Sequence, residues 1–282
     1  MSAATGRLPR TALTDFGTYL LLSIVCILLV IPILWIFSTS FKTPGEIFAV
    51  PTTLLPQEPT VENYAAVVAG GFRSYLLNSL VAASGATALG LLLGIPAAFG
   101  FARYRFRLSG LLLSFTVVTR IFPPIALALP FFLEFKAIGL TDTPFGLIVA
   151  YVPIIFPLMI WILEGFFRDY PEEILDAARI DGLGVIRTLV RIVIPTSLPA
   201  VGVATLFGFL VAWNEFVIAL TLTRTPAGQT LPVGISTLIT QFQTLWGQMM
   251  AVAAIYLLPL LAVTVIAQRG LVRGLMSGAT KG

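Results

Sequence analysis

Apolar stretches long enough to cross a membrane alternate with short polar segments along the chain. Six such runs cover residues 16–40, 75–101, 109–133, 144–163, 198–221 and 247–268, and two of them contain an ionisable residue. A hydrocarbon core about 30 Å thick needs roughly 20 apolar helical residues for each crossing. The pattern predicts an all-α integral membrane protein, with six transmembrane helices in a single domain that spans residues 1–282.

The second run carries small residues at every fourth position. They are Ala82, Ala86, Gly90, Gly94 and Ala98. Small side chains at this spacing form a narrow groove along a helix, and such grooves let two membrane helices approach closely. We therefore expect another helix to pack against this face.

Composition agrees with a membrane protein and excludes several kinds of chemistry. Of the 282 residues, 57% are hydrophobic and 11% are charged, and the chain has no histidine and one cysteine. Histidine-based catalytic triads, HExxH zinc sites and clusters that need several thiolates are therefore excluded. The chain also lacks the Gly-x-x-x-x-Gly-Lys-Ser/Thr loop that cradles nucleotide phosphates. We expect no catalysis, no metal site and no cofactor in this chain.

Positive charge is divided unevenly between the two sides of the predicted bundle. Short cytoplasmic loops of membrane proteins are enriched in lysine and arginine. One side holds twelve of these residues, namely Arg7, Arg10, Arg103, Arg105, Arg107, Arg168, Arg179, Arg187, Arg191, Arg269, Arg273 and Lys281. The other side holds four, namely Lys42, Arg73, Lys136 and Arg224. The bias predicts that both termini are cytoplasmic, and the scattered arginines match no nucleic-acid-binding motif.

The segment 171–199 is the longest charge-bearing stretch and falls on the predicted cytoplasmic side. A proline followed by two acidic residues favours a helix start at Pro171, and Gly182 suits a left-handed helix end. One helical face between them is formed by Ile174, Ala177, Ala178 and Asp181. A second helix with the same periodicity follows Gly184, until Pro195 interrupts its hydrogen bonds. We expect a helix, a glycine elbow and a helix.

A few polar residues lie within the apolar runs, and we consider them candidates for a transport path or for buried polar contacts. They are Asn78, Arg120, Asn214 and Glu215. A charged side chain that faces lipid is unfavourable by several kcal/mol, so we expect Arg120 and Glu215 to face the protein interior, a polar cavity or a partner subunit. Arg120 either lines a transport path or binds backbone carbonyls that Pro123 and Pro124 leave free. Pairing between Arg120 and Glu215 stays open.

The sequence DAARIDGLGVIRTLVRIVIP at 176–195 resembles the cytoplasmic loop of permease subunits of binding-protein-dependent ABC importers. That loop reads Glu-Ala-Ala, two residues, Asp-Gly, and a proline near position 20. The corresponding residues here are Asp176, Ala177, Ala178, Asp181, Gly182 and Pro195, with Leu183 where an alanine is common. Other segments resemble the carbohydrate-uptake branch, which includes the maltose and trehalose permeases: AAFGFARYRF (97–106), AWNEF (212–216), TLPVG (230–234) and GLMSGATKG (274–282).

The resemblance implies a multi-pass permease of a bacterial or archaeal cytoplasmic membrane, surrounded by lipid. Segment 171–199 would be the coupling loop that docks on an ATPase. The residues that the resemblance assigns to docking are Asp176, Ala177, Ala178, Asp181, Gly182, Leu183 and Pro195. The implied partners are a second homologous permease subunit, two cytoplasmic ATPase subunits that bind ATP and Mg, and an extracytoplasmic solute-binding protein. The implied substrate is a sugar or a sugar derivative.

Other functions deserve comparison with this expectation. Glycerophosphodiesters or other polyols are alternative substrates, because the same branch handles them. A secondary transporter often shows repeated broken helices in its two halves, and no such internal repeat is visible here. An intramembrane enzyme would need a nucleophile and a base, which are hard to assemble without histidine.

Overall fold

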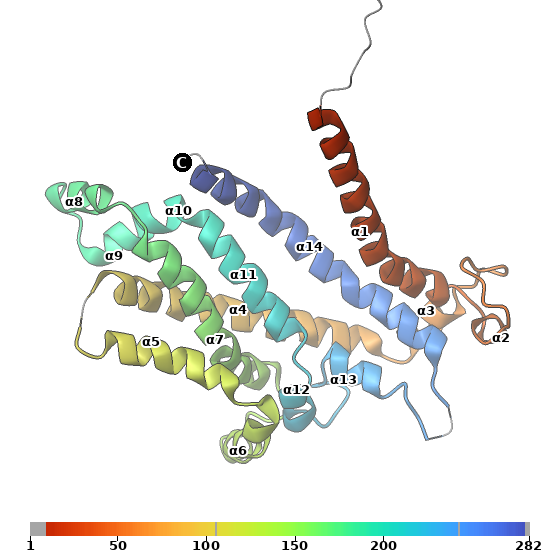
Figure 1. Cartoon of the computed structure of the whole chain (residues 1–282). Helices are drawn as coiled ribbons and strands as arrows, with labels where there is room; N and C mark the ends of the chain where they lie inside the picture. Colours follow the sequence, from red (N-terminus) through yellow and green to blue (C-terminus); the bar gives the residue numbers. More distant parts are fainter. Residues whose placement is uncertain (1–9, 105, 242, 280–282) are drawn as a thin grey trace, which may run out of the picture.

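The computed structural model describes residues 10–104, 106–241 and 243–279, and this part of the chain is almost entirely helical (Figure 1). Within it, the β-structure is limited to an isolated bridge between Ile239 and Thr244. The predicted all-α fold class is therefore confirmed.

Four helices are long and apolar enough to cross a membrane. They are α1 (Arg10–Ser40), α4 (Phe72–Arg103), α7 (Pro144–Arg168) and α14 (Trp246–Ala279). Each contains one of the predicted runs and extends beyond it at one or both ends. Backbone hydrogen bonding continues past the last apolar residue, because it does not depend on side-chain polarity.

The run 109–133, predicted as one helix, is broken in its middle. α5 (Ser109–Val118) and the 3₁₀ turn η1 (Thr119–Ile121) meet α6 (Pro124–Ala137) at an angle of 97°. Phe122, between them, is extended, as a residue before proline prefers. Pro123 and Pro124 also lack the N–H that would continue the helical ladder. The two prolines thus account for a bend that the apolar pattern does not reveal.

The run 198–221 is also divided. α11 (Leu198–Trp213) ends before Asn214, and the short helix α12 (Val217–Leu222) follows. At its other end, α11 meets the helical segment Val185–Thr196 at 83°. The fold has up to six spans if each bent pair of helices crosses once.

The centre of the bundle is the contact between α4 and α7, with α11 packed against both. The five small residues of α4 are all buried. A Cβ added at Gly90 would lie 2.8 Å from the sulfur of Met159, a fully buried residue of α7. The predicted close packing along this face is present, and its partner is α7.

The shorter elements gather on two opposite sides of the molecule. On one side, Figure 1 shows α8 (Glu172–Ile180), α9 (Val185–Thr188), α10 (Ile194–Thr196) and the C-terminal end of α14. On the other side lie α6, α12 and α13 (Leu231–Ser236). The helices α2 (Pro44–Ile47) and α3 (Glu62–Ala69) follow α1.

Candidate functional site

A helical hook projects from the bundle between α7 and α11. Its first arm, α8, carries Glu172 and Glu173 in its first turn, and Pro171 caps the start. The arm ends at Gly182, which adopts φ +75°. The N–H of Gly182 donates to the Arg179 carbonyl at 3.0 Å, and the N–H of Leu183 donates to the Ala178 carbonyl at 2.9 Å. These two bonds form a Schellman helix end, so the glycine elbow is a defined turn.

The second arm consists of α9, the π turn η2 (Leu189–Val193) and α10. The N–H of Ile194 donates to the carbonyl of Leu189, five residues earlier. In an α-helix, the ring of Pro195 would meet the carbonyl four residues before it. The wider π turn relieves that contact, and the arm continues to Thr196. The helix therefore ends one residue later than the proline alone predicts, and the chain bends at Ser197.

The two arms of the hook have an inner and an outer face. The inner face is buried against the bundle and consists of the apolar residues Leu175, Ala178, Leu189 and Val193 together with Thr188. The outer face exposes large aliphatic side chains, among which Ile180 is 86% and Ile186 is 77% accessible. Ala177 lies on the outer face, whereas Ala178 is 1% exposed. The two alanines therefore do not share a docking face, because neighbouring residues on a helix point about 100° apart.

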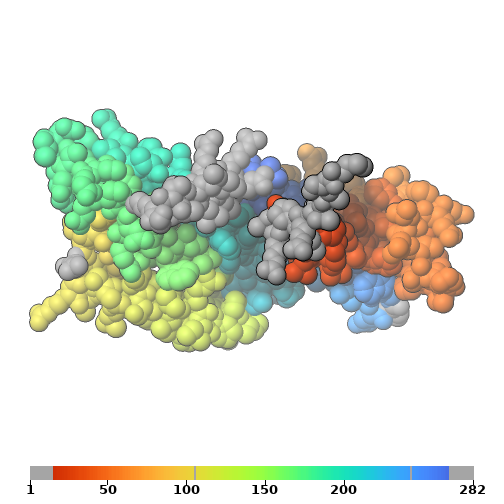
Figure 2. All heavy atoms as spheres, turned by 45° about the horizontal axis from the view of Figure 1, so that its top comes forward, coloured from red at the N-terminus to blue at the C-terminus, as the bar shows by residue number. Residues whose placement is uncertain are grey.

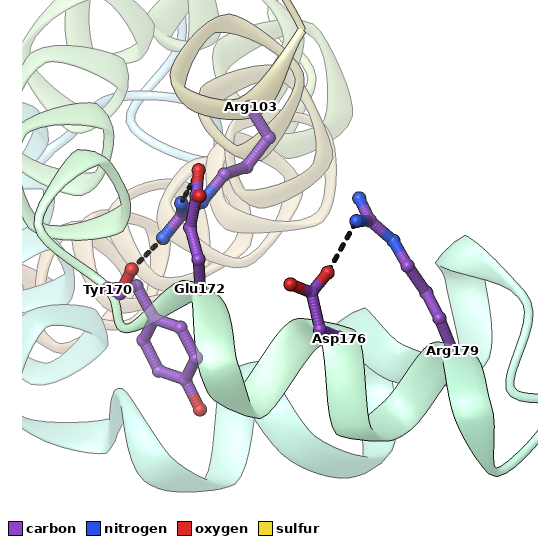
Figure 3. Close-up of polar contacts among 5 residues, drawn as sticks. All are labelled: Arg103, Tyr170, Glu172, Asp176 and Arg179. Atoms are coloured by element: carbon purple, nitrogen blue, oxygen red, sulfur yellow. Dashed lines mark hydrogen bonds and ion pairs between the residues drawn. The ribbon is translucent and has the colours of Figure 1, made fainter.

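Arg103, the last residue of α4, fastens the hook to the bundle (Figure 3). Its guanidinium donates to the carbonyl of Tyr170 and lies 3.7 Å from the carboxylate of Glu172. The hydroxyl of Tyr170 is 2.8 Å from that of Thr196 at the end of the second arm. The Arg103 side chain is only 11% exposed, whereas that of Glu172 is 84% exposed, so the hydrogen bond to Tyr170 is the better shielded of the two contacts. Arg103 and Tyr170 thus connect α4 to both arms.

The predicted coupling residues also include Asp176, whose carboxylate pairs with Arg179 one turn later at 2.8 Å. Both side chains are more than half exposed, so this pair contributes little to stability. Asp181 is exposed at the end of α8.

Sequence reasoning treated Arg103 only as part of the positive charge bias and in the segment 97–106. Its position at the end of a long apolar helix, directly before the loop, is the signal that could have identified it.

Arg120 lies in η1, where the chain bends between α5 and α6; we call α5, η1 and α6 together the broken span. It forms no hydrogen bond or ion pair with any described residue, so it does not bind the carbonyls that the prolines leave free. Its side chain borders a hollow of about 760 Å³ between the broken span, α7 and α11. Of the alternatives for Arg120, contact with its own backbone is therefore wrong.

Glu215 is buried and bonds within its own segment. Its two carboxylate oxygens accept hydrogen bonds from the N–H groups of Ile218 at 2.9 Å and Ala219 at 3.0 Å. These are unpaired donors of the first turn of α12, where a negative charge is favourable. Glu215 thus caps α12 and forms no ion pair with Arg120 among the described contacts.

Asn214 and Asn78 both hold chain segments together. The side chain of Asn214 donates to the Leu210 carbonyl at 2.7 Å and accepts from the hydroxyl of Tyr256 at 2.8 Å. The amide of Asn78 donates to the carbonyls of Ala227 and Gln229, at 2.6 and 3.0 Å. The contacts of Asn78 fasten α4 to the loop before α13, which is a structural role.

The profile of a known protein family matches two thirds of this sequence. Residues 90–277, which include the hook and the broken span, match the family described as "Binding-protein-dependent transport system inner membrane component". The chain belongs to this family. It is therefore a multi-pass membrane permease of a transporter complex, and subunits of this kind are generally not catalytic.

Relatives of the permease match over most of their lengths. The trehalose transport system permease protein SugB of Mycobacterium tuberculosis is 36% identical over 89% of this chain and 92% of its own. The trehalose/maltose transport system permease protein MalG of Thermococcus litoralis is 33% identical over 93% of this chain and 94% of its own.

A solved structure has the same fold as the permease. It belongs to a bacterial ABC transporter involved in the import of the acidic polysaccharide alginate. The TM-score is 0.77, with 21% identity, and the match covers 94% of this chain and 99% of the other. The likeness extends over nearly the whole permease.

Proposed function

We propose that this permease is the membrane subunit of an ATP-driven importer for a sugar or a sugar derivative. It forms the translocation path with a second, homologous permease subunit. Two cytoplasmic ATPase subunits bind ATP and Mg, and an extracytoplasmic solute-binding protein delivers the substrate. Both termini and the hook face the cytoplasm, in agreement with the excess of lysine and arginine on that side.

The observation that carries the proposal is the hook with its exposed aliphatic outer face. Ile180 and Ile186 are 86% and 77% accessible. In the topology that the charge bias favours, the hook lies in water on the cytoplasmic side. Large apolar side chains exposed to water indicate a surface that another protein covers. The hook is thus suited to dock in a groove of an ATPase subunit, with Asp176, Ala177 and Asp181 also exposed along α8.

The contacts of Arg103 and Tyr170 indicate how a docked ATPase moves the bundle. A force on α8 reaches α4 through the Arg103 guanidinium, and it reaches α10 through the Tyr170 hydroxyl. Because the Schellman turn at Gly182 fixes the angle between the arms, the hook moves as one body. Closure of the ATPase subunits would then shift α4, α7 and α11 relative to the broken span.

Sugar as the substrate is supported by the relatives, whose printed names include trehalose and maltose transport. The test is ATP hydrolysis by the complete transporter in proteoliposomes, with the solute-binding protein present and candidate solutes added singly. We expect a sugar to stimulate hydrolysis and to accumulate inside the vesicles. If only a glycerophosphodiester or a polyol stimulates hydrolysis, that compound would replace sugar as the proposed substrate. Uptake driven by an ion gradient without ATPase subunits would overturn the proposal.

A further inference from the structure

The broken span leaves an arginine unpaired near the middle of an apolar run. Arg120 lies eleven residues after Ser109, where α5 begins, and at about 1.5 Å of helix per residue this is roughly half the thickness of the hydrocarbon core. Among the described residues, none accepts a hydrogen bond from its guanidinium or forms an ion pair with it. A guanidinium at that depth is strongly unfavourable without an acceptor. An acceptor must therefore come from outside the part of the chain that the structure describes.

The surroundings of Arg120 decide whether water, lipid or protein supplies the hydrogen-bond acceptor. The hollow beside it, about 760 Å³, is walled mainly by aromatic and aliphatic side chains, including Phe115, Phe122, Phe131 and Phe156. Its two threonine hydroxyls, of Thr116 and Thr119, already donate to carbonyls of their own helix. Apart from Arg120 and the two threonines, such walls offer water no hydrogen-bonding partner, and lipid tails offer no acceptor. A protein segment supplies both an apolar surface and an acceptor.

The helix that frames the hollow is itself poorly covered by its own chain. None of the ten residues of α5 is buried, and none in η1 is buried. Figure 2 shows the side chains of α5 and α6, in yellow, along one edge of the molecule. This edge therefore combines an apolar hollow, an uncovered helix and a positive charge.

We infer that the hollow at Arg120 receives a transmembrane helix of the second permease subunit, and that this helix carries an Asp or Glu whose carboxylate pairs with Arg120. A carboxylate is the acceptor that best compensates a guanidinium, because charge and bidentate geometry both match. The four phenylalanines would then pack against the apolar residues around it. The inference rests on the proposed pairing of two permease subunits and specifies the face at which they meet.

Cross-linking tests the contact directly. Phe122 is 59% exposed and borders the hollow, so a photoreactive phenylalanine analogue at this position replaces it with little change in shape. The tagged transporter is irradiated in native membranes, and the cross-linked peptide is identified by mass spectrometry. We expect a transmembrane peptide of the second permease that contains an Asp or Glu. A peptide of any other subunit, or lipid adducts alone, would overturn the inference.

Substitution of Arg120 tests the ion pair. Arg120→Leu should lower recovery of the second permease with the tagged chain by about tenfold or more, and Arg120→Lys should retain most of it. Arg73→Leu is the matched control, because Arg73 is an exposed arginine outside the hollow, and it should recover wild-type amounts. Abundance of the tagged chain in the membrane is measured alongside, so that a folding defect is recognised.

Charge reversal gives a readout that a folding defect cannot imitate. Arg120→Glu should abolish pairing, and replacement of the cross-linked partner carboxylate by Lys should restore it. Full recovery of the second permease by Arg120→Leu with uptake lost would place Arg120 in the solute path and overturn the inference. The proposed function fails separately, if the wild-type transporter shows no ATP-driven uptake while the cross-link to a second permease persists.

Discussion

The hook and the broken span are both interrupted helices, and they differ in how their polar groups are satisfied. The hook turns at Gly182, where its free N–H groups bond to carbonyls of the first arm. The broken span turns at Pro123 and Pro124, and beside that turn Arg120 has no partner among the described residues. The hook also buries four apolar side chains and Thr188, whereas α5 buries none.

The difference shows which region of the permease satisfies its polar groups through contacts within this chain. The hook has a defined turn, an inner face packed on the bundle and a largely buried arginine that fastens it, so contacts within this chain account for its shape. The broken span has an uncovered helix and a charge without a partner among the described residues, so we expect its shape to depend on the second permease subunit inferred above. The hook is suited to transmit force, and the broken span is suited to adjust to a partner.

The largest expected effect comes from changing the turn of the hook. Gly182→Val places a β-branched residue at φ +75°, which costs at least about 1–2 kcal/mol and changes the angle between the arms. We expect membrane insertion to be retained and uptake in proteoliposomes to fall at least about tenfold. Gly184→Ala is the matched control, because Gly184 has φ −72° and open space around its Cβ position, and it should transport normally. Equal uptake by the two variants would show that the turn geometry is unimportant.

A smaller effect is expected from releasing the hook from α4. Arg103→Met removes a charged hydrogen bond to Tyr170 and the ion pair with Glu172, a loss of about 1.5–3 kcal/mol. The ATPase should still dock, but less solute should be transported for each ATP hydrolysed. Measuring uptake and hydrolysis together in proteoliposomes gives this ratio, and Arg103→Lys should restore part of it.

The control for Arg103 is another arginine of the same region. Arg179→Met removes an exposed pair with Asp176 that is worth about 0–1 kcal/mol, so the ratio of uptake to hydrolysis should stay near that of the wild type. If both variants change the ratio equally, Arg103 acts through the charge of the loop and has no special role in fastening the hook.

The two regions also differ in how far the sequence predicts them. The hook was predictable because its signals are local: acidic residues at a helix start, a glycine at its end and a proline near the return. The bend at Pro123 and Pro124 was underestimated, because a run of apolar residues has the same composition in a straight and a broken helix. The separation of Ala177 from Ala178 needed the position of the bundle, which the local pattern does not contain.

The polar residues of the spans were harder to assign than the hook. Sequence reasoning placed Asn78, Arg120, Asn214 and Glu215 together as candidates for the transport path. The structure has Glu215 capping α12 and Asn78 holding the loop at 227–229. The free-energy cost of burying a polar side chain identifies which residues need partners but does not identify the partner. Backbone N–H and carbonyl groups, near in the chain for Glu215 and far for Asn78, serve as well as charged side chains.

The smallest expected effect concerns the outer end of the broken span. Asp142, in the loop after α6, accepts hydrogen bonds from the N–H groups of Arg224 and Thr225 and from the Thr225 hydroxyl. Its own N–H donates to the carbonyl of Leu222 at 2.8 Å. The span that is uncovered at its middle is therefore anchored at this end, and the anchor depends on a carboxylate.

Asp142→Asn tests that anchor, because Asn tolerates the φ of +61° at this position and keeps the shape of the side chain. Burial raises the pKa of the Asp142 carboxyl, but the hydrogen bonds from Arg224 and Thr225 outweigh it and hold the pKa below its ordinary value of 3.8. A carboxyl whose pKa is lower in the folded state stabilises that state above the unfolded pKa, and this contribution is lost as the pH falls through the folded value.

At neutral pH the Asn variant should expose the amides of Arg224 and Thr225 to hydrogen exchange severalfold faster than the wild type, since about 0.5–1.5 kcal/mol is lost. Below about pH 4, after correction for the intrinsic exchange rate, the wild type should approach the variant. A constant difference between the two down to about pH 3 would mean that the charge of Asp142 does not hold this end of the span.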